Sequence, residues 1–173
     1  MKAAAKKIES ADMIRVVKSG DAQAIAAIYN DYILNGVETF ETEPLSVPQM
    51  QKRIGEISAK FPYFVFETDG GEVVAYAYAH NWKERAAYAL TLETSVYVAR
   101  KSRGAGIGRK LTEKLVDECR KRGYRALIAC ITDGNQASIK LHEKLGFKKV
   151  SHFEKVGIKF GGELDVIDLE LRL

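Results

Sequence analysis

The sequence predicts an α/β protein built on a mixed sheet with helices on its faces. The middle of the chain shows a series of strand-like hairpin segments, and two strand–helix units follow it, so antiparallel and parallel pairing are both expected. The composition agrees, because 173 residues with 46% hydrophobic and 29% charged side chains are typical of one globular domain. No linker, repeat or low-complexity segment divides residues 1–173, so we expect a single domain.

The N-terminal third is predicted to hold one short strand and two helices. The strand covers residues 13–18, and capping residues then lead into a helix over 22–33 whose apolar side chains share one face. Gly36 ends that helix. Ser46 opens a second helix, which runs to about Lys60.

The pattern then changes from a helical to a strand-like period. Residues 63–68 and 72–82 form a hairpin around an Asp-Gly-Gly turn, and residues 87–98 are another long strand. The clearest helix follows at 106–122, where apolar residues recur every four positions until Gly123 stops it. The remaining elements are strand 126–131, helix 135–145 and the closing strands 147–155 and 164–171.

Charge, cysteine content and hydropathy exclude classes of protein without selecting a function. The net charge of +4, from 27 Lys and Arg against 23 Asp and Glu, fits a solvated surface or one anionic pocket as well as it fits nucleic acid. Cys119 and Cys130 match no metal or redox spacing and are expected to fill the core. The longest apolar run, 73–79, is far shorter than the roughly 20 residues of a membrane span. We expect a soluble cytoplasmic protein whose residues 1–12 form a flexible extension.

A glycine-rich turn lies between a predicted strand and the clearest predicted helix. Glycines let backbone N–H groups converge on an anion, and the following helix N-terminus adds free donors and a positive dipole end. The spacing matches neither a Walker A motif nor Gly-x-Gly-x-x-Gly. The residues alone leave two interpretations open, a phosphate site or a turn that binds nothing. The turn and its basic neighbours are Arg103, Gly104, Ala105, Gly106, Ile107, Gly108, Arg109 and Lys110.

Two motifs in this order resemble those of the GNAT acetyltransferases. The resemblance implies the GNAT fold, a twisted and mostly antiparallel mixed sheet of about six to seven strands flanked by about four helices. The two motifs, about 30 residues apart, are Arg103-x-x-Gly106-x-Gly108 and Asn135-x-x-Ser138-x-x-Leu141-His142-Glu143-x-Leu145-Gly146-Phe147.

Further segments narrow the resemblance to the phosphinothricin and methionine sulfoximine N-acetyltransferase group. They cover the chain from about residue 13 to its end. Members of this group are commonly homodimers, so the resemblance also implies a homodimer. The segments are Tyr29-Asn30-x-Tyr32, Thr39-Phe40-Glu41-Thr42-Glu43-Pro44, Tyr76-Ala77-Tyr78, Trp82-Lys83, Glu93-Thr94-Ser95-Val96-Tyr97-Val98, Leu141-His142-Glu143 and Lys159-Phe160-Gly161-Gly162.

The resemblance implies acetyl-CoA as co-substrate and places it along three parts of the chain. The glycine-rich turn is expected to hold the pyrophosphate, and the motif that begins at Asn135 is expected to lie near the pantetheine arm and the sulfur. The strand over 96–98 is expected to pair with the pantetheine and to donate a backbone N–H to the thioester oxygen. The expected cofactor-binding residues are Val96, Tyr97, Val98, Arg103, Gly104, Ala105, Gly106, Ile107, Gly108, Arg109, Asn135 and Ser138.

Glu93 is the candidate general base. Acetyl transfer to an amine requires the ammonium to lose a proton, since only the free amine has a lone pair. Glu93 lies in an apolar-rich strand, where partial burial can raise the pKa of a carboxylate, and the resemblance places the catalytic glutamate at this position. The alternative is a strand glutamate that faces solvent or pairs with a basic residue.

His142 occupies the position at which many GNAT members carry a general-acid tyrosine, a departure that the phosphinothricin group shares. A histidine with a pKa near neutrality can protonate a leaving thiolate. It can equally be a structural residue beside the sulfur, with the proton coming from solvent. His80 and His152 have no metal-ligand companions at usable spacing, so we interpret both as structural and expect no metal.

Basic residues at the end of a predicted strand are candidates to bind a substrate carboxylate. The resemblance places a substrate contact at Lys83 or Arg85, and a solvated turn is the alternative. Several relatives carry another arginine near the position of Tyr88 and usually a tryptophan at that of Glu163, so recognition here can also rest on Lys159. The candidate substrate-binding residues are Phe40, Lys83, Arg85, Tyr88, Glu93, Thr94, Ser95 and Lys159, with Phe40 and Tyr88 as apolar walls.

The leading hypothesis is an N-acetyltransferase that moves acetyl from acetyl-CoA to the α-amine of a small amino-acid-like substrate, of the phosphinothricin or methionine sulfoximine type. The alternatives are another amine (a protein N-terminus, a polyamine or an ordinary amino acid) and a CoA-binding module without turnover, against which Glu93 argues. A small basic pocket would favour the amino acid, and an open acidic groove would favour a protein or a polyamine. We expect no nucleic-acid or membrane partner, because the basic residues are spread over helix faces without interleaved aromatic residues.

Overall fold

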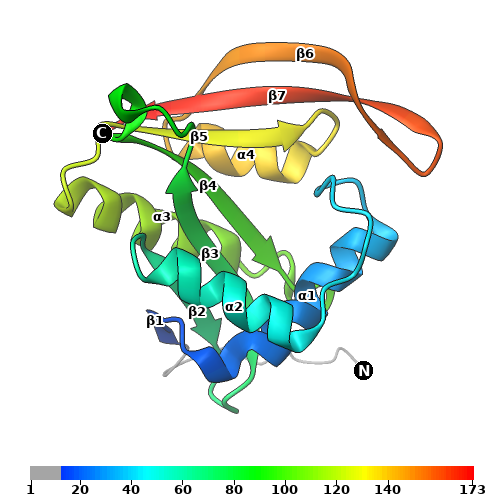
Figure 1. Ribbon diagram of the computed structural model, residues 1–173, viewed down its shortest axis with the longest axis vertical. Helices are drawn as coiled ribbons and strands as arrows, with labels where there is room; N and C mark the ends of the chain where they lie inside the picture. Colours follow the sequence, from blue (N-terminus) through cyan, green and yellow to red (C-terminus); the bar gives the residue numbers. More distant parts are fainter. Residues whose placement is uncertain (1–12) are drawn as a thin grey trace, which may run out of the picture.

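In the described part of the chain, seven strands form one open sheet in the order β1-β2-β3-β4-β5-β7-β6 (Figure 1). The computed structural model describes residues 13–173, so the expected extension over 1–12 lies outside the described residues. Within these residues only β4 and β5 run parallel, and the other neighbouring strands are antiparallel, which confirms the predicted mixed sheet. The strands are β1 (Met13–Val16), β2 (Tyr63–Glu67), β3 (Val73–Asn81), β4 (Thr91–Val98), β5 (Ala126–Thr132), β6 (Lys148–Lys159) and β7 (Gly162–Arg172).

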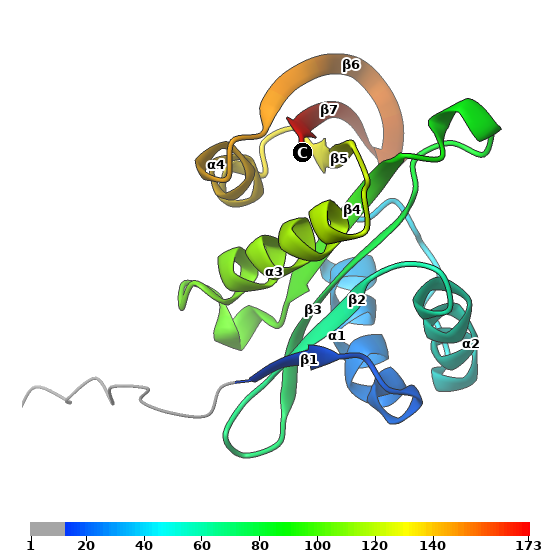
Figure 2. The ribbon, with the colours of Figure 1, turned by 90° about the vertical axis from the view of Figure 1, so that its left-hand side faces the viewer.

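Helices cover both faces of this sheet, as predicted (Figure 2). On one face, Met50 and other helix side chains pack against Tyr76 in one buried cluster, and on the opposite face Leu111 packs in a second cluster with Leu127. No helix in the described part of the chain is both long and apolar enough to cross a membrane. The helices are α1 (Ala22–Asn35) and α2 (Val47–Ser58) on the first face, α3 (Ile107–Lys121) on the second, and α4 (Gln136–Lys144) beside β5.

Local sequence determines where helices α2 and α3 begin. The Ser46 hydroxyl accepts from the Gln49 N–H at 3.4 Å, and the Gln49 side chain accepts from the Ser46 N–H at 2.8 Å. This reciprocal capping box starts α2. Helix α3 starts after Gly106, whose φ of 78° lies in the left-handed region that glycine adopts without strain.

The strand predicted over 87–98 is wrong at its start. Strand β4 begins at Thr91, and Ala86–Tyr88 forms a short 3-10 turn instead. Strand β3 ends at Asn81, which lies opposite Leu92, so the residues before Thr91 lie beyond the end of the β3–β4 ladder. An apolar segment without a ladder to join has no reason to stay extended.

The closing strands are longer than the sequence predicts. They form one hairpin, β6–β7, in which Lys159 pairs with Gly162 around the two-residue turn Phe160-Gly161. Both turn residues have positive φ, 52° and 74°, as in a type I′ turn, whose twist matches that of the flanking strands. The hairpin therefore pairs up to its tip, and its outer strand β6 is one edge of the sheet (Figure 1).

Candidate active site

Strands β4 and β5 pair only over their first residues and then diverge. Their register runs from Thr91 opposite Ala126 to Glu93 opposite Ile128 and stops there. Beyond this point the strands enclose a cavity of about 490 Å³ whose walls include residues 94–98 and 129–132. We call this cavity the strand cleft. The sequence carries no signal for the divergence, because the pairing of two distant strands is a tertiary property.

Backbone groups of β4 point toward the strand cleft. The Tyr32 hydroxyl donates to the Val98 carbonyl at 2.7 Å and accepts from the Val98 N–H at 3.4 Å, while the next residue, Ala99, donates to β3. Backbone groups alternate in direction along a strand, so the N–H and C=O of Val96 point the same way as those of Val98, toward the cleft. A ligand in the cleft can therefore hydrogen-bond to this part of β4, just as β5 does between Thr91 and Glu93.

The glycine-rich turn closes one end of the strand cleft. Gly104 and Gly106 have φ of 82° and 78°, and a Cβ at either position would meet nothing within 4 Å, so the turn leaves an open cradle next to the N-terminus of α3. Backbone donors and a helix N-terminus of this kind suit phosphate oxygens. The turn residues that line the cleft are Arg103, Gly104, Gly106, Ile107, Gly108 and Arg109, whereas Ala105 is not among the lining residues.

The start of α4 forms the opposite wall of the strand cleft. The Asn135 side chain accepts from the Ser138 N–H at 3.2 Å and caps the helix, and both residues line the cleft. His142 also lines it but is only 3% exposed, and burial lowers the pKa of its imidazole. His142 Nδ1 lies 2.8 Å from the Ser138 carbonyl, which only accepts, so Nδ1 carries the proton and Nε2 of the neutral ring is an acceptor.

A second cavity, also about 490 Å³, opens on the face of the sheet that α1 and α2 cover. We call it the glutamate pocket, because Glu38, Glu41 and Glu93 all line it. Side chains alternate along a strand, so Glu93, Ser95 and Tyr97 point to this face, beside Tyr78 and His80 of β3. Residues that line both cavities, and so mark where they meet, are Glu38, Ser95, Tyr97, Cys130 and Thr132.

Glu93 is the carboxylate with the clearest shift in acidity in this region. Burial raises the pKa of Glu93, the neighbouring Asp168 raises it further, and His80 opposes the shift. His80 lies directly opposite Glu93 in the β3–β4 ladder, with Nε2 3.9 Å from Glu93 Oε1. A carboxylate that holds its proton more tightly than usual is a stronger base when ionised.

Several lining residues of the glutamate pocket escaped the sequence interpretation. Tyr29 belongs to one of the segments that carry the family resemblance but was given no site role, yet its hydroxyl lies 2.8 Å from the Thr39 hydroxyl at the pocket wall, and burial raises the pKa of Tyr29 to about 12. His80 was interpreted as structural, and it lines the pocket beside Glu93. Glu38 carried no motif of its own. Only the alternation of β3 and β4 around Glu93 offered a signal, and it points to Tyr78 and His80.

The structure does not bring all candidate substrate residues to the pocket. Phe40 lines the glutamate pocket, and Thr94 and Ser95 line the strand cleft. Lys83, Arg85 and Tyr88 lie on the exposed segment after β3 and line neither cavity, and Lys83 Nζ lies 4.0 Å from the centre of the Trp82 ring. Lys159 is 5% exposed, and its ammonium donates to the carbonyls of Thr39 at 2.8 Å and Tyr32 at 3.4 Å. Lys159 thus holds the chain segment after α1 in place.

The expectation that Cys130 fills the core is wrong. Cys119 is buried, but Cys130 is exposed, because it lies on β5 just where β4 moves away and leaves it uncovered. Although part of the residue is exposed, its sulfur is desolvated, and this desolvation together with the carboxylates of Asp168 and Glu93 raises the pKa of the thiol to about 12. Cys130 is therefore a neutral thiol at the junction of the two cavities and not a nucleophile at neutral pH.

The comparisons with known proteins agree with this geometry. A family model described as acetyltransferase (GNAT) domain matches residues 14–167. The chain is 40% identical over 156 residues to phosphinothricin N-acetyltransferase of Alcaligenes faecalis. This alignment covers 89% of the chain and 79% of the relative. The chain is also 34% identical over 161 residues to an L-methionine sulfoximine/L-methionine sulfone acetyltransferase of Pseudomonas paraeruginosa, with 92% and 94% coverage.

A solved structure extends the match to the fold. The crystal structure of a GNAT superfamily phosphinothricin acetyltransferase from Sinorhizobium meliloti, in complex with acetyl-CoA, superposes with a TM-score of 0.91 at 36% identity, over 94% of this chain and 88% of that one. The open glycine cradle, the arginines of the turn and the free edge of β4 fit a long anionic cofactor of this kind. The chain therefore belongs to the GNAT acetyltransferases, enzymes that take their acetyl group from acetyl-CoA.

Proposed function

We propose that the protein acetylates the amine of a small amino-acid-like substrate of the phosphinothricin or methionine sulfoximine type. The observation that carries the proposal is the meeting of the strand cleft and the glutamate pocket at Ser95 and Tyr97, two and four residues from Glu93 along β4. A cofactor in the cleft and an amine in the pocket would face each other there. The relatives named for phosphinothricin and methionine sulfoximine support the choice of substrate type.

The proposed mechanism is direct attack by the amine. Glu93 accepts the proton of the substrate ammonium, directly or through a water, and its raised pKa suits that task. The N–H of Val96 donates a hydrogen bond to the acetyl oxygen as negative charge develops on it. Acetyl-CoA supplies an activated thioester, whose C–S bond breaks as the new C–N bond forms.

For His142 we propose the structural one of its two expected roles. A general acid must present a proton to the sulfur, but the neutral ring holds its proton on Nδ1, against the Ser138 carbonyl. Protonating Nε2 as well would create a buried imidazolium, and burial lowers the pKa of His142. The thiolate then takes its proton from solvent.

The charge of the glutamate pocket supports a second candidate acceptor. Among residues 13–173, its lining includes three glutamates and neither lysine nor arginine. Glu41 is neutralised by Arg53 at 2.7 Å and Glu38 pairs with Arg103 at 3.2 Å, so Glu93 is the glutamate that leaves the pocket acidic. An acidic site favours a polyamine or another amine without a carboxylate. For an amino acid, a substrate carboxylate would have to reach Lys83 or Arg85 at the exposed turn.

Release of free thiol from acetyl-CoA tests the function directly. The panel should contain methionine sulfoximine, phosphinothricin, methionine, spermidine and a peptide with a free N-terminus, each with a no-acceptor control. We expect turnover with methionine sulfoximine or phosphinothricin. Turnover with spermidine alone would select the polyamine, and CoA binding without turnover on any amine would leave only a binding module.

We further propose that the enzyme is a homodimer joined through the β6–β7 hairpin. The outer strand β6 has a free edge, and large apolar side chains on or beside it are exposed, among them Ile158 at 76% and Phe160 at 66%. An apolar edge of this size invites a partner, and a second copy presents the same edge. Light scattering should give twice the mass of one chain for the natural protein and the mass of a single chain for Ile158→Asp.

For the compartment we propose the cytoplasm. Cys119 and Cys130 are both free thiols. A reducing compartment maintains cysteines in this state. Fractionation of the source cells with an antibody against the protein would test this.

A further inference from the structure

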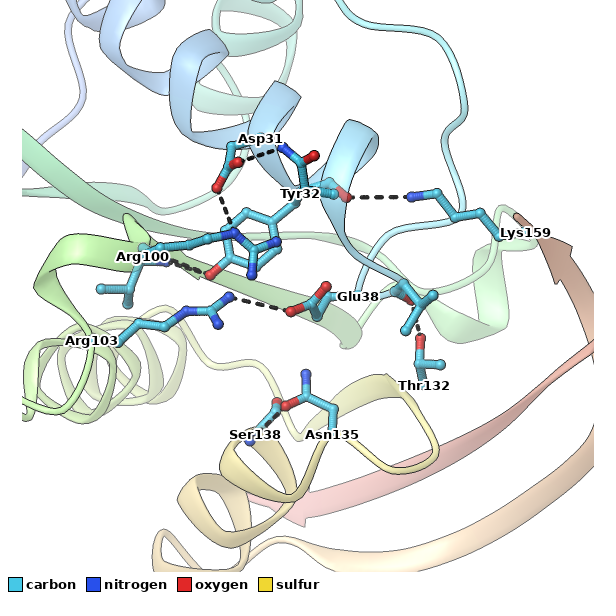
Figure 3. A network of polar contacts seen from close by, with 12 residues as sticks. Asp31, Tyr32, Glu38, Arg100, Arg103, Thr132, Asn135, Ser138 and Lys159 are labelled. Atoms are coloured by element: carbon cyan, nitrogen blue, oxygen red, sulfur yellow. Dashed lines mark hydrogen bonds and ion pairs between the residues drawn. The ribbon is translucent and has the colours of Figure 1, made fainter. Parts of the chain in front are cut away.

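The segment between α1 and α2 carries a carboxylate that faces both cavities. Glu38 lines the strand cleft and the glutamate pocket, on the segment that Lys159 holds through Thr39. In Figure 3 Glu38 lies between Arg103 of the glycine-rich turn and Thr132 of β5, with Asn135, the N-cap residue of α4, below it. No other acidic residue lines both cavities in the described part of the chain.

The two carboxylate oxygens of Glu38 are in different situations. Oε1 accepts from Arg103 Nη2 at 3.2 Å. Oε2 is buried, and none of the described residues donates a hydrogen bond to it. It fits where it is only because Gly36 has no side chain, since a Cβ at position 36 would overlap Oε2. A buried carboxylate oxygen without a donor costs free energy, so this arrangement is easily exchanged for a better one.

Arg103 is also one of the cations expected to bind cofactor phosphate. Its guanidinium lies 5.0 Å from the centre of the Tyr32 ring, at the mouth of the strand cleft. A phosphate offers a guanidinium more charge and two parallel hydrogen bonds, where Glu38 makes a single one. An anion that enters the cleft would therefore displace Glu38 from Arg103.

We propose that Glu38 is a shared counter-ion that links the two sites. In the free enzyme Glu38 pairs with Arg103; once cofactor phosphate occupies Arg103, the carboxylate turns to the ammonium of the acceptor in the glutamate pocket. Of the other two glutamates there, Glu41 is held by Arg53 and Glu93 serves as base, so Glu38 is the one free to bind the ammonium. This inference rests on the proposed function for its second half only.

The first test is the affinity for CoA alone, measured by calorimetry without turnover. Because Glu38 competes for Arg103, Glu38→Gln should bind CoA about two- to fivefold more tightly than the natural chain. In an Arg103→Gln background the same change should have no effect, because there is no competition left to remove. Gly36→Ala keeps the charge but displaces the carboxylate, and should reproduce the tighter binding.

Asp31 provides the matched control. It pairs with Arg100 at 2.7 Å, and the Arg100 guanidinium lies 5.2 Å from the centre of the Tyr32 ring, but neither residue lines a cavity. Asp31→Asn removes the same charge from the same region without freeing Arg103. If Asp31→Asn and Glu38→Gln strengthen CoA binding equally, the effect is general electrostatics and the proposal is wrong.

The second test is the coupling between the two ligands, with methionine sulfoximine as probe. The natural chain should bind CoA about fivefold more tightly when the amine is present, because each ligand frees a group that the other needs. Glu38→Gln should lose this coupling, and equal coupling in both proteins would overturn the link. If methionine sulfoximine does not bind at all, the proposed substrate fails, while the CoA measurements still decide the competition for Arg103.

Discussion

The strand cleft and the glutamate pocket have similar volumes but are built in different ways. The cleft is formed largely by backbone: the free edge of β4, the left-handed glycines of the turn and the first turn of α4. The pocket is formed by side chains from α1, β3, β4, β5, β7 and the segment after α1. A backbone site demands particular local conformations, which leave motifs, whereas a side-chain site can change residue by residue.

This difference explains why the family is more evident than the substrate. The glycines at 104, 106 and 108 and the Asn135 cap sit in local structures that other residue types do not form as well. The pocket wall brings together Tyr29, Thr39 and Val166, which lie in separate segments of the sequence. Its acidity and its acceptor must be established from the three-dimensional arrangement.

The largest effect should come from the base in the glutamate pocket. Glu93→Gln removes the proton acceptor, and we expect kcat to fall by about 10²- to 10⁴-fold. Affinity for CoA, measured by calorimetry, should stay within twofold of the natural value, since Glu93 does not line the strand cleft. A large loss of CoA affinity would contradict the assignment of cofactor binding to the strand cleft and of the base to the glutamate pocket.

A change in the glycine-rich turn should produce the opposite pattern. Gly106→Ala forces a side chain into the left-handed region, and we expect CoA to bind about tenfold more weakly through the disturbed backbone donors. Gly123→Ala is the matched control: Gly123 also has a φ of 82° and open space around it, but it follows α3 outside both cavities. Both variants should lose similar stability in thermal melts, and only Gly106→Ala should lose CoA.

The histidine of the cleft should matter much less to the rate than a general acid would. We expect His142→Gln to lower kcat by far less than the roughly 10²-fold that a lost general acid costs. The kcat of the natural chain should not fall toward high pH, because burial already keeps the His142 ring neutral at neutral pH. If kcat falls at high pH in the natural chain but not in His142→Gln, then His142 acts as the general acid.

The smallest effect should be on stability. Burial raises the pKa of Glu93, so the folded protein favours the protonated form, and ionisation above that pKa destabilises the fold. Glu93→Gln should therefore melt higher than the natural chain near neutral pH, by about 2 °C. The difference should vanish as the pH falls through the usual glutamate range, where both proteins carry a neutral side chain. Melting curves that differ equally at every pH would contradict this.

Much of the fold followed from local pattern. The helices at α1, α2 and α3 were predicted within a few residues, because caps, glycine stops and apolar periodicity act within the segment itself. The errors occurred where partners decide: the segment before Thr91 lies beyond the ladder with β3, and Cys130 is uncovered because β4 leaves β5. Neither partner is adjacent in sequence.

The sequence by itself determined the order of elements, the glycine-rich turn before α3 and, through its motifs, the GNAT family. These features rest on backbone conformations that neighbouring residues specify, so they can be predicted from the amino-acid sequence. Only the tertiary structure decided that β4 and β5 diverge after Glu93, that two cavities meet there, and that Glu38 reaches both. Those properties depend on which distant side chains come into contact, and contacts between distant residues arise only when the sheet and its helices have packed.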